Sequence, residues 1–239
     1  MDPTRARGSV VLVHGTWGNP DDWRWVRALL DEAGVDVVAP DLPSHRSDAG
    51  LAADAAEVRR TVQACRPPTV LVGWSYGGDV VGLAAVGATG VVGLVYVAAV
   101  PRVPDAAARD TLWFRDNPHV TVGEDGTFVL DDRWWREEEA GATFPPDVRE
   151  HLAHHPRRPA SLRVETERQV VDAAWVGTPT TVLLGRQDVL TPEAEQRLAA
   201  DRVADVRLLD CDHFVLWRDP AAVSVAALDL LDGRSQTPG

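Results

Sequence analysis

The chain has 239 residues, 45% of them hydrophobic and 25% charged, so its composition excludes a disordered chain and allows one domain with a substantial core. Its formal net charge of −12 argues against binding to nucleic acid, which requires a surplus of clustered cations. All 24 basic residues are arginines, and the lack of lysine excludes every mechanism that passes through a lysine Schiff base.

The first residues lead almost directly into the apolar run Val10–Val13, with no charged-then-apolar leader before it. The longest apolar stretch, Val91–Val100, is too short to span a bilayer. Cys65 and Cys211 have neither disulfide nor metal-ligand spacing. We therefore expect a cytoplasmic protein with reduced thiols and no membrane attachment. The sequence makes no prediction of an oligomeric state.

Short apolar runs bounded by turn residues predict six buried strands. They are Ser9–Val13, Val35–Ala39, Thr69–Gly73, Val91–Val100, Thr180–Gly185 and Val206–Asp210. Segments with helical periodicity and helix-ending residues alternate with these strands. The predicted helices are Asp21–Ala33, Leu51–Cys65, Tyr76–Ala88, Pro192–Asp201 and Pro220–Leu231. This alternation predicts a mainly parallel, doubly wound six-stranded sheet with helices on both faces.

The alternation stops between the fourth and fifth strands, where the composition turns to Trp, Glu, Arg, His and Pro. A hairpin is predicted at Val120–Leu130, and helices near Arg133–Ala140, Pro146–His155 and Ala160–Val171. We therefore expect a single domain with its core in residues 1–100 and 176–239 and an inserted cap in residues 101–175. Active sites of such sheets lie at the carboxyl ends of the strands, so the residues after each strand are the candidates for chemistry.

After the third strand stands Gly73-Trp74-Ser75-Tyr76-Gly77, a G-x-S-x-G motif between a predicted strand and a predicted helix. To raise a serine hydroxyl above the sheet, the strand must turn sharply into the helix, and side chains at positions 73 and 77 would collide there. The motif also occurs by chance, but the strand–turn–helix context favours Ser75 as a catalytic nucleophile.

A serine hydroxyl needs a base, and the chain order expected for this architecture is serine, acid, histidine. Asp188 follows the fifth predicted strand and His213 follows the sixth. We expect His213 to accept the Ser75 proton and Asp188 to orient the imidazole. Asp188 could instead be a turn or helix-capping aspartate. Asp105, just after the fourth strand, is a second choice of acid, whereas Asp212, adjacent to His213 in sequence, is less able to reach the far side of its ring.

The loop His14-Gly15-Thr16-Trp17-Gly18 follows the first strand, where a second oxyanion donor is expected. We predict an oxyanion hole formed by the backbone N–H groups of Thr16 and Tyr76, with Trp17 as the alternative to Thr16. His14 is interpreted as a structural residue of this loop. Trp17 and Trp74, beside the oxyanion loop and the nucleophile, are candidates for an apolar wall that binds substrate.

Other polar clusters have structural interpretations. The loop Asp41–His45 is more typical of loop stabilisation than of chemistry. His151 and His155 have i,i+4 spacing, but without a third ligand or an H-E-x-x-H order we expect no metal site. Trp113-Phe114 and Trp134-Trp135 could line a pocket or pack the cap onto the core. No cofactor is expected.

Five segments together carry a family resemblance: His14–Trp17, Trp23–Trp25, Leu29–Gly34, Asp41-Leu42 and Gly73–Gly78. They resemble the plant methylesterase and hydroxynitrile lyase group of α/β-hydrolases, whose layout small bacterial hydrolases share. The resemblance covers Ser9–Val103 and Thr180–Leu231 and is weaker across the cap. It implies the α/β-hydrolase fold and cofactor-free carboxylester hydrolysis, with Ser75, Asp188 and His213 at the triad positions.

Two departures distinguish this chain within that group. The lyases carry Thr directly after the first-strand histidine and use a lysine near the cap, but here Gly15 takes that position and lysine is absent. The esterases more often have His before the nucleophile, where this chain has Trp74. Cyanohydrin cleavage by that route is therefore not expected, and no specific plant-hormone ester is predicted. From the three candidate residues at the strand ends we expect hydrolysis of a small to medium carboxylic ester or lactone. The alternatives are a cyclase, a C–C hydrolase or a perhydrolase on the same fold, and a ligand-binding receptor with a residual triad.

Overall fold

The computed structural model describes residues 7–102, 117–131, 143–167, 174–191, 199 and 201–234. Its centre is a six-stranded sheet with the order β2-β1-β3-β4-β8-β9, in which every neighbouring pair is parallel. The strands are β1 (Ser9–Val13), β2 (Asp36–Val38), β3 (Thr69–Trp74), β4 (Val91–Val97), β8 (Thr180–Gly185) and β9 (Asp205–Leu209). This sheet confirms the predicted fold class, and all six strands lie where the sequence predicted them to within a few residues.

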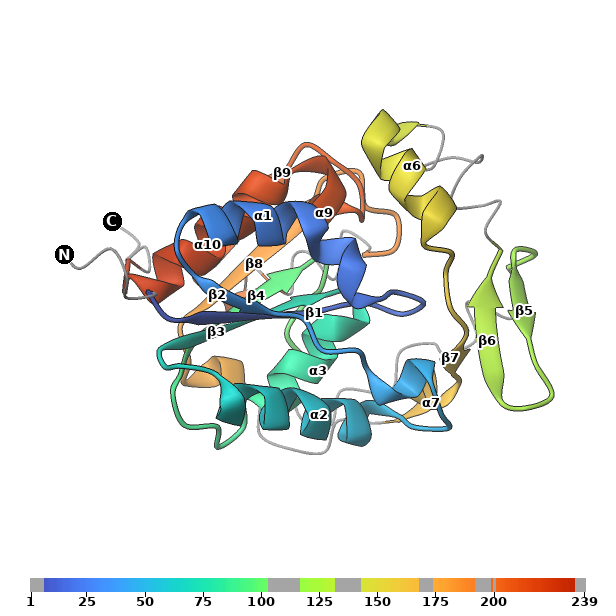
Figure 1. The fold of residues 1–239 in the computed structure, drawn as a ribbon, viewed down its shortest axis with the longest axis horizontal. Coiled ribbons are helices and arrows are strands. Elements are labelled where there is room, and N and C mark those ends of the chain that lie inside the picture. Colours follow the sequence, from blue (N-terminus) through green and yellow to red (C-terminus); the bar gives the residue numbers. More distant parts are fainter. Residues whose placement is uncertain are drawn as a thin grey trace.

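Helices cover both faces of the sheet (Figure 1). One face carries α1 (Arg24–Glu32) and α10 (Pro220–Leu231), with the short η1 (Pro20–Trp23) and α9 (Val215–Arg218) beside them. The other face carries α2 (Leu51–Ala64) and α3 (Tyr76–Ala84), with η2 (Pro43–His45) next to α2. Because both faces are covered, β1 and β3 are buried along their whole lengths and consist almost entirely of apolar residues.

The segment between β4 and β8, which we call the insertion, contains a second sheet and, among its described residues, two α-helices. The antiparallel sheet has the order β5-β6-β7, with β5 (Val120–Val122), β6 (Thr127–Leu130) and β7 (Ala160–Ser161). The helices are α6 (Pro146–His154) and α7 (Arg163–Thr166), and η3 (Ala174–Val176) leads back towards β8. Figure 1 shows the hairpin β5–β6 and helix α6 at one end of the main sheet.

One expectation in the insertion is wrong. The sequence predicted a helix over Ala160–Val171, but Ala160 and Ser161 form a strand that pairs with Phe128 and Thr127 of β6. The helical part is only the single turn α7, and residues 168–171 lie outside the described part of the chain. Two residues of strand carry no detectable period in a sequence, and only the backbone pairing with β6 makes them extended.

A buried ion pair fastens the insertion to the core. Arg157 donates two hydrogen bonds to the carboxylate of Asp22, at 2.9 and 2.7 Å, and Asp22 is completely buried. Burial alone would raise the pKa of Asp22. The charge of the Arg157 guanidinium and the hydrogen bonds that the Asp22 carboxylate accepts outweigh burial and hold that pKa well below its usual range. On the surface, the indole of Trp25 donates to Asp147 of α6 at 2.8 Å.

Candidate active site

The turn from β3 into α3 holds Ser75 in the left-handed region, with φ 52° and ψ −122°. A Cβ atom on Gly73 would lie 2.2 Å from the carbonyl oxygen of Gly77, and one on Gly77 would lie 2.3 Å from that of Val13. Both distances are too short for any side chain. The two glycines are therefore required by the close backbone contacts of this turn, and Ser75 is kept in a strained, half-buried position at its apex.

Asp188 lies in the turn after β8 and uses both carboxylate oxygens. Oδ1 accepts hydrogen bonds from the backbone N–H groups of Leu190 and Thr191, at 2.8 and 3.0 Å. Oδ2 lies 2.8 Å from Nδ1 of His213. The sequence offered a turn aspartate and a partner for His213 as alternatives, and the geometry contains both. The turn bonds hold the carboxylate so that its second oxygen faces the imidazole.

These contacts set the electrostatics of Asp188. Burial raises the pKa of its carboxyl group, but the hydrogen bond with His213 and those from Leu190 and Thr191 outweigh burial and leave the pKa below the usual value. Asp188 is therefore a carboxylate at neutral pH. An ionised carboxylate favours the tautomer of His213 that carries its proton on Nδ1, which leaves Nε2 able to accept one.

The loop after β9 brings His213 beside this turn. A Cβ atom on Gly185, at the end of β8, would lie 2.4 Å from the carbonyl oxygen of Cys211 and 2.3 Å from that of Asp212. The N–H of Gln187 donates to the Cys211 carbonyl at 3.0 Å. Gly185 therefore permits the close approach of the loop that carries His213, a role that the sequence analysis missed.

A hydrogen bond joins this loop to the turn that carries Ser75. The indole N–H of Trp74 donates to the carbonyl oxygen of His213 at 3.0 Å, and the two rings lie 6.0 Å apart. Trp74 also packs against Phe214 and Trp217 and is 2% exposed. The residue next to Ser75 thus holds the backbone of His213 in place.

Two neighbours of His213 face other partners. Asp212 accepts a hydrogen bond from the N–H of Phe214 and pairs with Arg218 at 2.7 Å, in agreement with the expectation that it does not serve the imidazole. Arg218 also donates to the carbonyl of Thr143 in the insertion at 2.6 Å. Burial, and then the charge of Asp212, raise the pKa of the Cys211 thiol to about 11, so that thiol stays protonated at neutral pH.

The loop after β1 runs directly beside Ser75. A Cβ atom on Gly15 would lie 3.2 Å from the Cβ of Ser75 and 3.1 Å from the carbonyl oxygen of Trp74. The N–H of Gly18 donates to the carbonyl of Gly15 at 3.1 Å and closes a turn in which Trp17 has a φ of 63°. Thr16, at the half-buried corner of this turn, and Tyr76, the first residue of α3, come from the two segments that meet at Ser75.

His14 stabilises this loop through hydrogen bonds, which agrees with its interpretation as a structural residue. It is fully buried, its Nδ1 lies 3.0 Å from the carbonyl oxygen of Gly15, and its Nε2 accepts from the N–H of Leu42 at 3.3 Å. Because Nε2 of His14 accepts a hydrogen bond, the proton of the neutral ring is on Nδ1, which donates to the Gly15 carbonyl. Arg158, which the sequence analysis missed, adds a clamp from the insertion: it donates to the Gly18 carbonyl at 2.8 Å and to Asp41 at 2.6 Å.

The remaining sequence candidates have these positions. Trp17 is 6% exposed; its indole donates to the carbonyl of Phe128 at 3.1 Å, and the two rings lie 5.2 Å apart. His151 stacks on His155 with ring centroids 4.3 Å apart. No group of three or more potential metal ligands occurs in the described part of the chain. Asp105, Trp113, Phe114, Trp134, Trp135 and the predicted helix Arg133–Ala140 lie outside the described residues, as does most of Pro192–Asp201.

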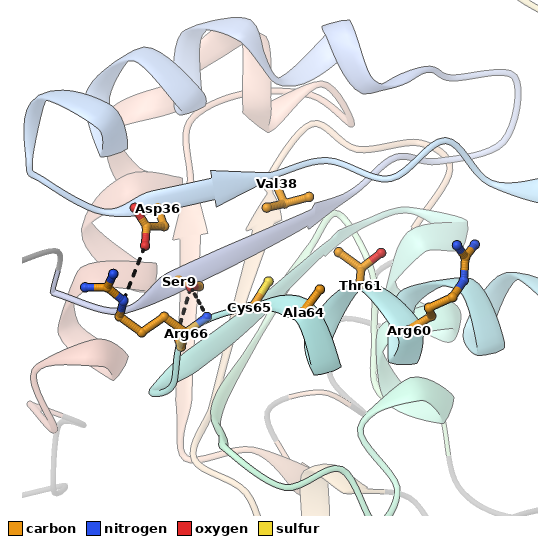
Figure 2. A pocket seen from close by; sticks show the side chains of 8 residues that line it. All are labelled: Ser9, Asp36, Val38, Arg60, Thr61, Ala64, Cys65 and Arg66. Atoms are coloured by element: carbon orange, nitrogen blue, oxygen red, sulfur yellow. Dashed lines mark hydrogen bonds and ion pairs between the residues drawn. The ribbon is translucent and has the colours of Figure 1, made fainter.

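A pocket of about 380 Å³ lies at a different place. Figure 2 shows the side chains that line it. It is lined by Ser9, Asp36, Val38, Arg60, Thr61, Ala64, Cys65 and Arg66. Ser9 is the first residue of β1 and Ala64 is the last residue of α2, so this pocket lies at the amino end of β1. Ser75, Asp188 and His213 follow the carboxyl ends of their strands, where parallel sheets bind ligands. The pocket is therefore separate from the candidate active site.

Comparison with known proteins identifies the family and the fold. The model of the alpha/beta hydrolase family matches residues 10–227. The chain belongs to the α/β hydrolase family. A search of curated proteins found no significant match. In the part of this α/β hydrolase that the structure describes, no helix has the length and apolar content needed to cross a membrane.

Several solved structures share the whole fold. A methylesterase from Arabidopsis is 20% identical, with a TM-score of 0.76, and the match covers 94% of this chain and 99% of that one. A pyrethroid hydrolase from Sphingobium faniae is 23% identical, with a TM-score of 0.75 and coverage of 94% and 97%. Tomato methylketone synthase I is 15% identical, with a TM-score of 0.74 and coverage of 95% and 98%. At these identities the likeness establishes the fold.

Proposed function

We propose that this α/β hydrolase cleaves a small to medium carboxylic ester or lactone through an acyl intermediate on Ser75. The observation that carries the proposal is the 3.0 Å hydrogen bond from the Trp74 indole to the carbonyl of His213. It links the residue beside the strained serine to the histidine whose ring bonds Asp188. Nucleophile, base and acid thus come from three strand ends at one edge of the sheet, in the order that acyl transfer by this architecture uses.

In the proposed reaction, Ser75 Oγ attacks the ester carbonyl carbon while its proton passes to Nε2 of His213. The tetrahedral intermediate collapses when the C–O bond to the alcohol breaks and His213 returns the proton to the departing oxygen. Water then attacks the acyl-serine with His213 as base, which releases the carboxylic acid and restores the hydroxyl. Asp188 stabilises the imidazolium that forms in each half of the reaction.

The oxyanion hole of this proposal consists of the N–H groups of Thr16 and Tyr76. The close approach of Gly15 to Ser75 and the position of Tyr76 at the start of α3 support it, because both segments then present backbone donors to the same space. Losing one such donor costs about 3 kcal/mol of transition-state stabilisation.

For the substrate, we propose a small molecule held by an apolar wall that includes Trp17 and Trp74. Both indoles are buried and hydrogen-bonded, so they would form the floor of a site rather than a mobile rim. We also propose that residues 101–175 act as a cap, which the contacts of Trp17 with Phe128 and of Gly18 with Arg158 support. A methylesterase and a pyrethroid hydrolase among the structural neighbours favour an ester.

A fluorophosphonate probe tests the nucleophile directly, because it labels activated serines. The wild-type protein is expected to be labelled and Ser75→Ala to be unlabelled. Ser224→Ala is a matched control, since Ser224 is a buried serine of α10 whose hydroxyl bonds the carbonyl of Pro220. Labelling that persists in Ser75→Ala, or is absent from the wild type, would overturn the assignment.

A panel of aryl esters and thioesters of graded acyl length then separates the reaction types. An esterase is expected to turn over at least one length class with kcat/KM well above the others. The likeness to methylketone synthase I keeps a non-esterase reaction on the same fold as the second candidate. Poor turnover of every ester by protein that the probe does label would favour that candidate.

A further inference from the structure

Asp54 is a buried carboxyl group that contacts Tyr76, whose backbone N–H is one of the proposed oxyanion donors. Asp54, in the first turn of α2, is completely buried, and its Oδ2 accepts a hydrogen bond from the Tyr76 hydroxyl at 2.8 Å. Its Oδ1 accepts from the backbone N–H of Ser44 at 2.9 Å. A carboxyl group without contact to water is costly unless its oxygens are satisfied, and here one bond on each oxygen comes from a segment next to the candidate site.

The bond between Asp54 and the Tyr76 hydroxyl reaches the turn that carries Ser75. Tyr76 directly follows Ser75, and its backbone N–H is a proposed oxyanion donor. Its ring is 4% exposed and its hydroxyl is held on a neighbouring helix, so the side chain is fixed at both ends. Fixing the side chain restricts the rotation of the peptide unit between Ser75 and Tyr76, which carries the donor N–H. Tyr76 thus connects Asp54 to the peptide unit that carries the proposed donor N–H.

The second bond leads to the other side of the site. Ser44 Oγ lies 3.1 Å from Nδ1 of His45, and the His45 ring packs edge-on against His14 with centroids 4.7 Å apart. His14 in turn bonds the carbonyl of Gly15 at 3.0 Å, and that carbonyl belongs to the peptide unit whose N–H is that of Thr16. Both proposed oxyanion donors are thus supported by groups that converge on one buried carboxyl.

The geometry points to Asp54 as a positioning residue that aims the oxyanion donors of Tyr76 and Thr16 without touching the substrate. This inference rests on the proposed function, since it assigns a support to the same site. It makes a specific demand: weakening the Asp54–Tyr76 bond lowers the rate of the chemical step and leaves substrate binding nearly unchanged, because the aim of the donors matters most when negative charge develops.

Tyr76→Phe removes the hydroxyl and keeps both the ring and the backbone N–H. We expect kcat on the best ester to fall about tenfold or more, with KM changed less than about twofold. The chain has two tyrosines, so Tyr96→Phe is a matched control. Tyr96 is also buried, at 2% exposed, but on β4, and loss of its hydroxyl is expected to leave kcat unchanged.

Two substitutions at Asp54 give the complementary test. Asp54→Asn keeps the shape: its oxygen can accept from Ser44 while its NH2 group donates to the Tyr76 oxygen, so we expect a smaller loss of kcat than in Tyr76→Phe. Asp54→Leu removes both bonds and is expected to lose at least as much as Tyr76→Phe. In the double variant Asp54→Leu/Tyr76→Phe, the fold-loss of kcat is expected to be smaller than the product of the two single-variant losses, because both changes remove the same hydrogen bond.

Inhibition by a trifluoromethyl ketone, which forms a charged tetrahedral adduct, provides a readout that general destabilisation would not move. Its affinity is expected to fall in parallel with kcat in folded Tyr76→Phe protein, with folding checked by thermal unfolding. Unchanged kcat and inhibitor affinity in Tyr76→Phe would overturn the positioning role while leaving the esterase intact. Wild-type protein that neither reacts with the probe nor hydrolyses any ester would overturn both claims. The measurements on Tyr76→Phe do not depend on the Asp54 variants. They decide the proposal even if Asp54→Leu does not fold.

Discussion

Asp188→Asn tests the proposed triad most sharply, because the structure fixes how the new amide must lie. The backbone N–H groups of Leu190 and Thr191 both point at Oδ1 of Asp188. An asparagine must place its oxygen there, since an NH2 group would face two donors. Its NH2 group then takes the position of Oδ2, 2.8 Å from Nδ1 of His213. A donor at that position requires Nδ1 to be unprotonated, and the proton of neutral His213 moves to Nε2, facing Ser75.

The expected loss follows from this inverted tautomer. Nε2 can no longer accept the serine proton, so kcat/KM is expected to fall by about 10⁴-fold, as for an aspartate-to-asparagine change in a serine protease triad. At about 1.4 kcal/mol per factor of ten, this corresponds to about 5.5 kcal/mol of transition-state stabilisation. The protein is expected to stay folded, because the two turn bonds to Leu190 and Thr191 are kept.

Steady-state hydrolysis of the best aryl ester, with fluorophosphonate labelling in parallel, measures the effect. Asp212→Asn is the matched control, since Asp212 is the adjacent carboxylate but bonds Phe214 and Arg218. We expect that control to lose less than about tenfold. Near wild-type activity in Asp188→Asn would refute the reasoning and make the alternative acid, Asp105, the next position to substitute.

The same variant also has a signature in stability. The pKa of Asp188 is lower in the folded protein than its ordinary value, so its ionisation stabilises the fold above that ordinary value. The stabilisation is lost as pH falls through the lowered, folded-state pKa. Asparagine does not ionise. Urea unfolding is therefore expected to give the largest difference between wild type and Asp188→Asn above about pH 5 and a shrinking difference below about pH 4. A difference that stays constant with pH would contradict the lowered pKa.

Two further outcomes follow from single contacts. Trp74→Phe removes the indole N–H that holds the His213 carbonyl. In steady-state kinetics, kcat is expected to fall about three- to tenfold with little change in KM. A raised KM at unchanged kcat would instead assign Trp74 to substrate binding alone. Arg157→Leu leaves the buried Asp22 carboxylate without its cation and is expected to lower the free energy of unfolding by about 3–5 kcal/mol, measured in urea. The double variant with Asp22→Asn is expected to lose less, and a single-variant loss below about 1 kcal/mol would show that the pair does not hold the insertion.

Several features of the fold could be predicted because they are local. A strand buried on both faces appears in the sequence as a continuous apolar run, and β1 and β8 lie where such runs begin and end. The turn at Ser75 was predictable because its steric demand falls on residues two positions away, which must lack a Cβ atom. The order of serine, aspartate and histidine after the third, fifth and sixth predicted strands then indicated the edge of the sheet at which to look.

The sequence by itself determined the parallel sheet, the glycine-flanked turn at Ser75 and the three candidate triad positions, because apolar periodicity and steric exclusion act between residues close in the chain. Only the tertiary structure decided that Asp188 bonds its own turn and His213 together, that Trp74 holds the His213 backbone, and that Arg157, Arg158 and Asp54 connect distant segments. Apart from the two bonds of Asp188 to its own turn, the partners in these contacts lie 22 to 140 positions apart in the chain. In the sequence, an arginine or an aspartate that faces water cannot be distinguished from one that bonds a buried partner. Such a contact can be identified only when the fold has brought the two partners together.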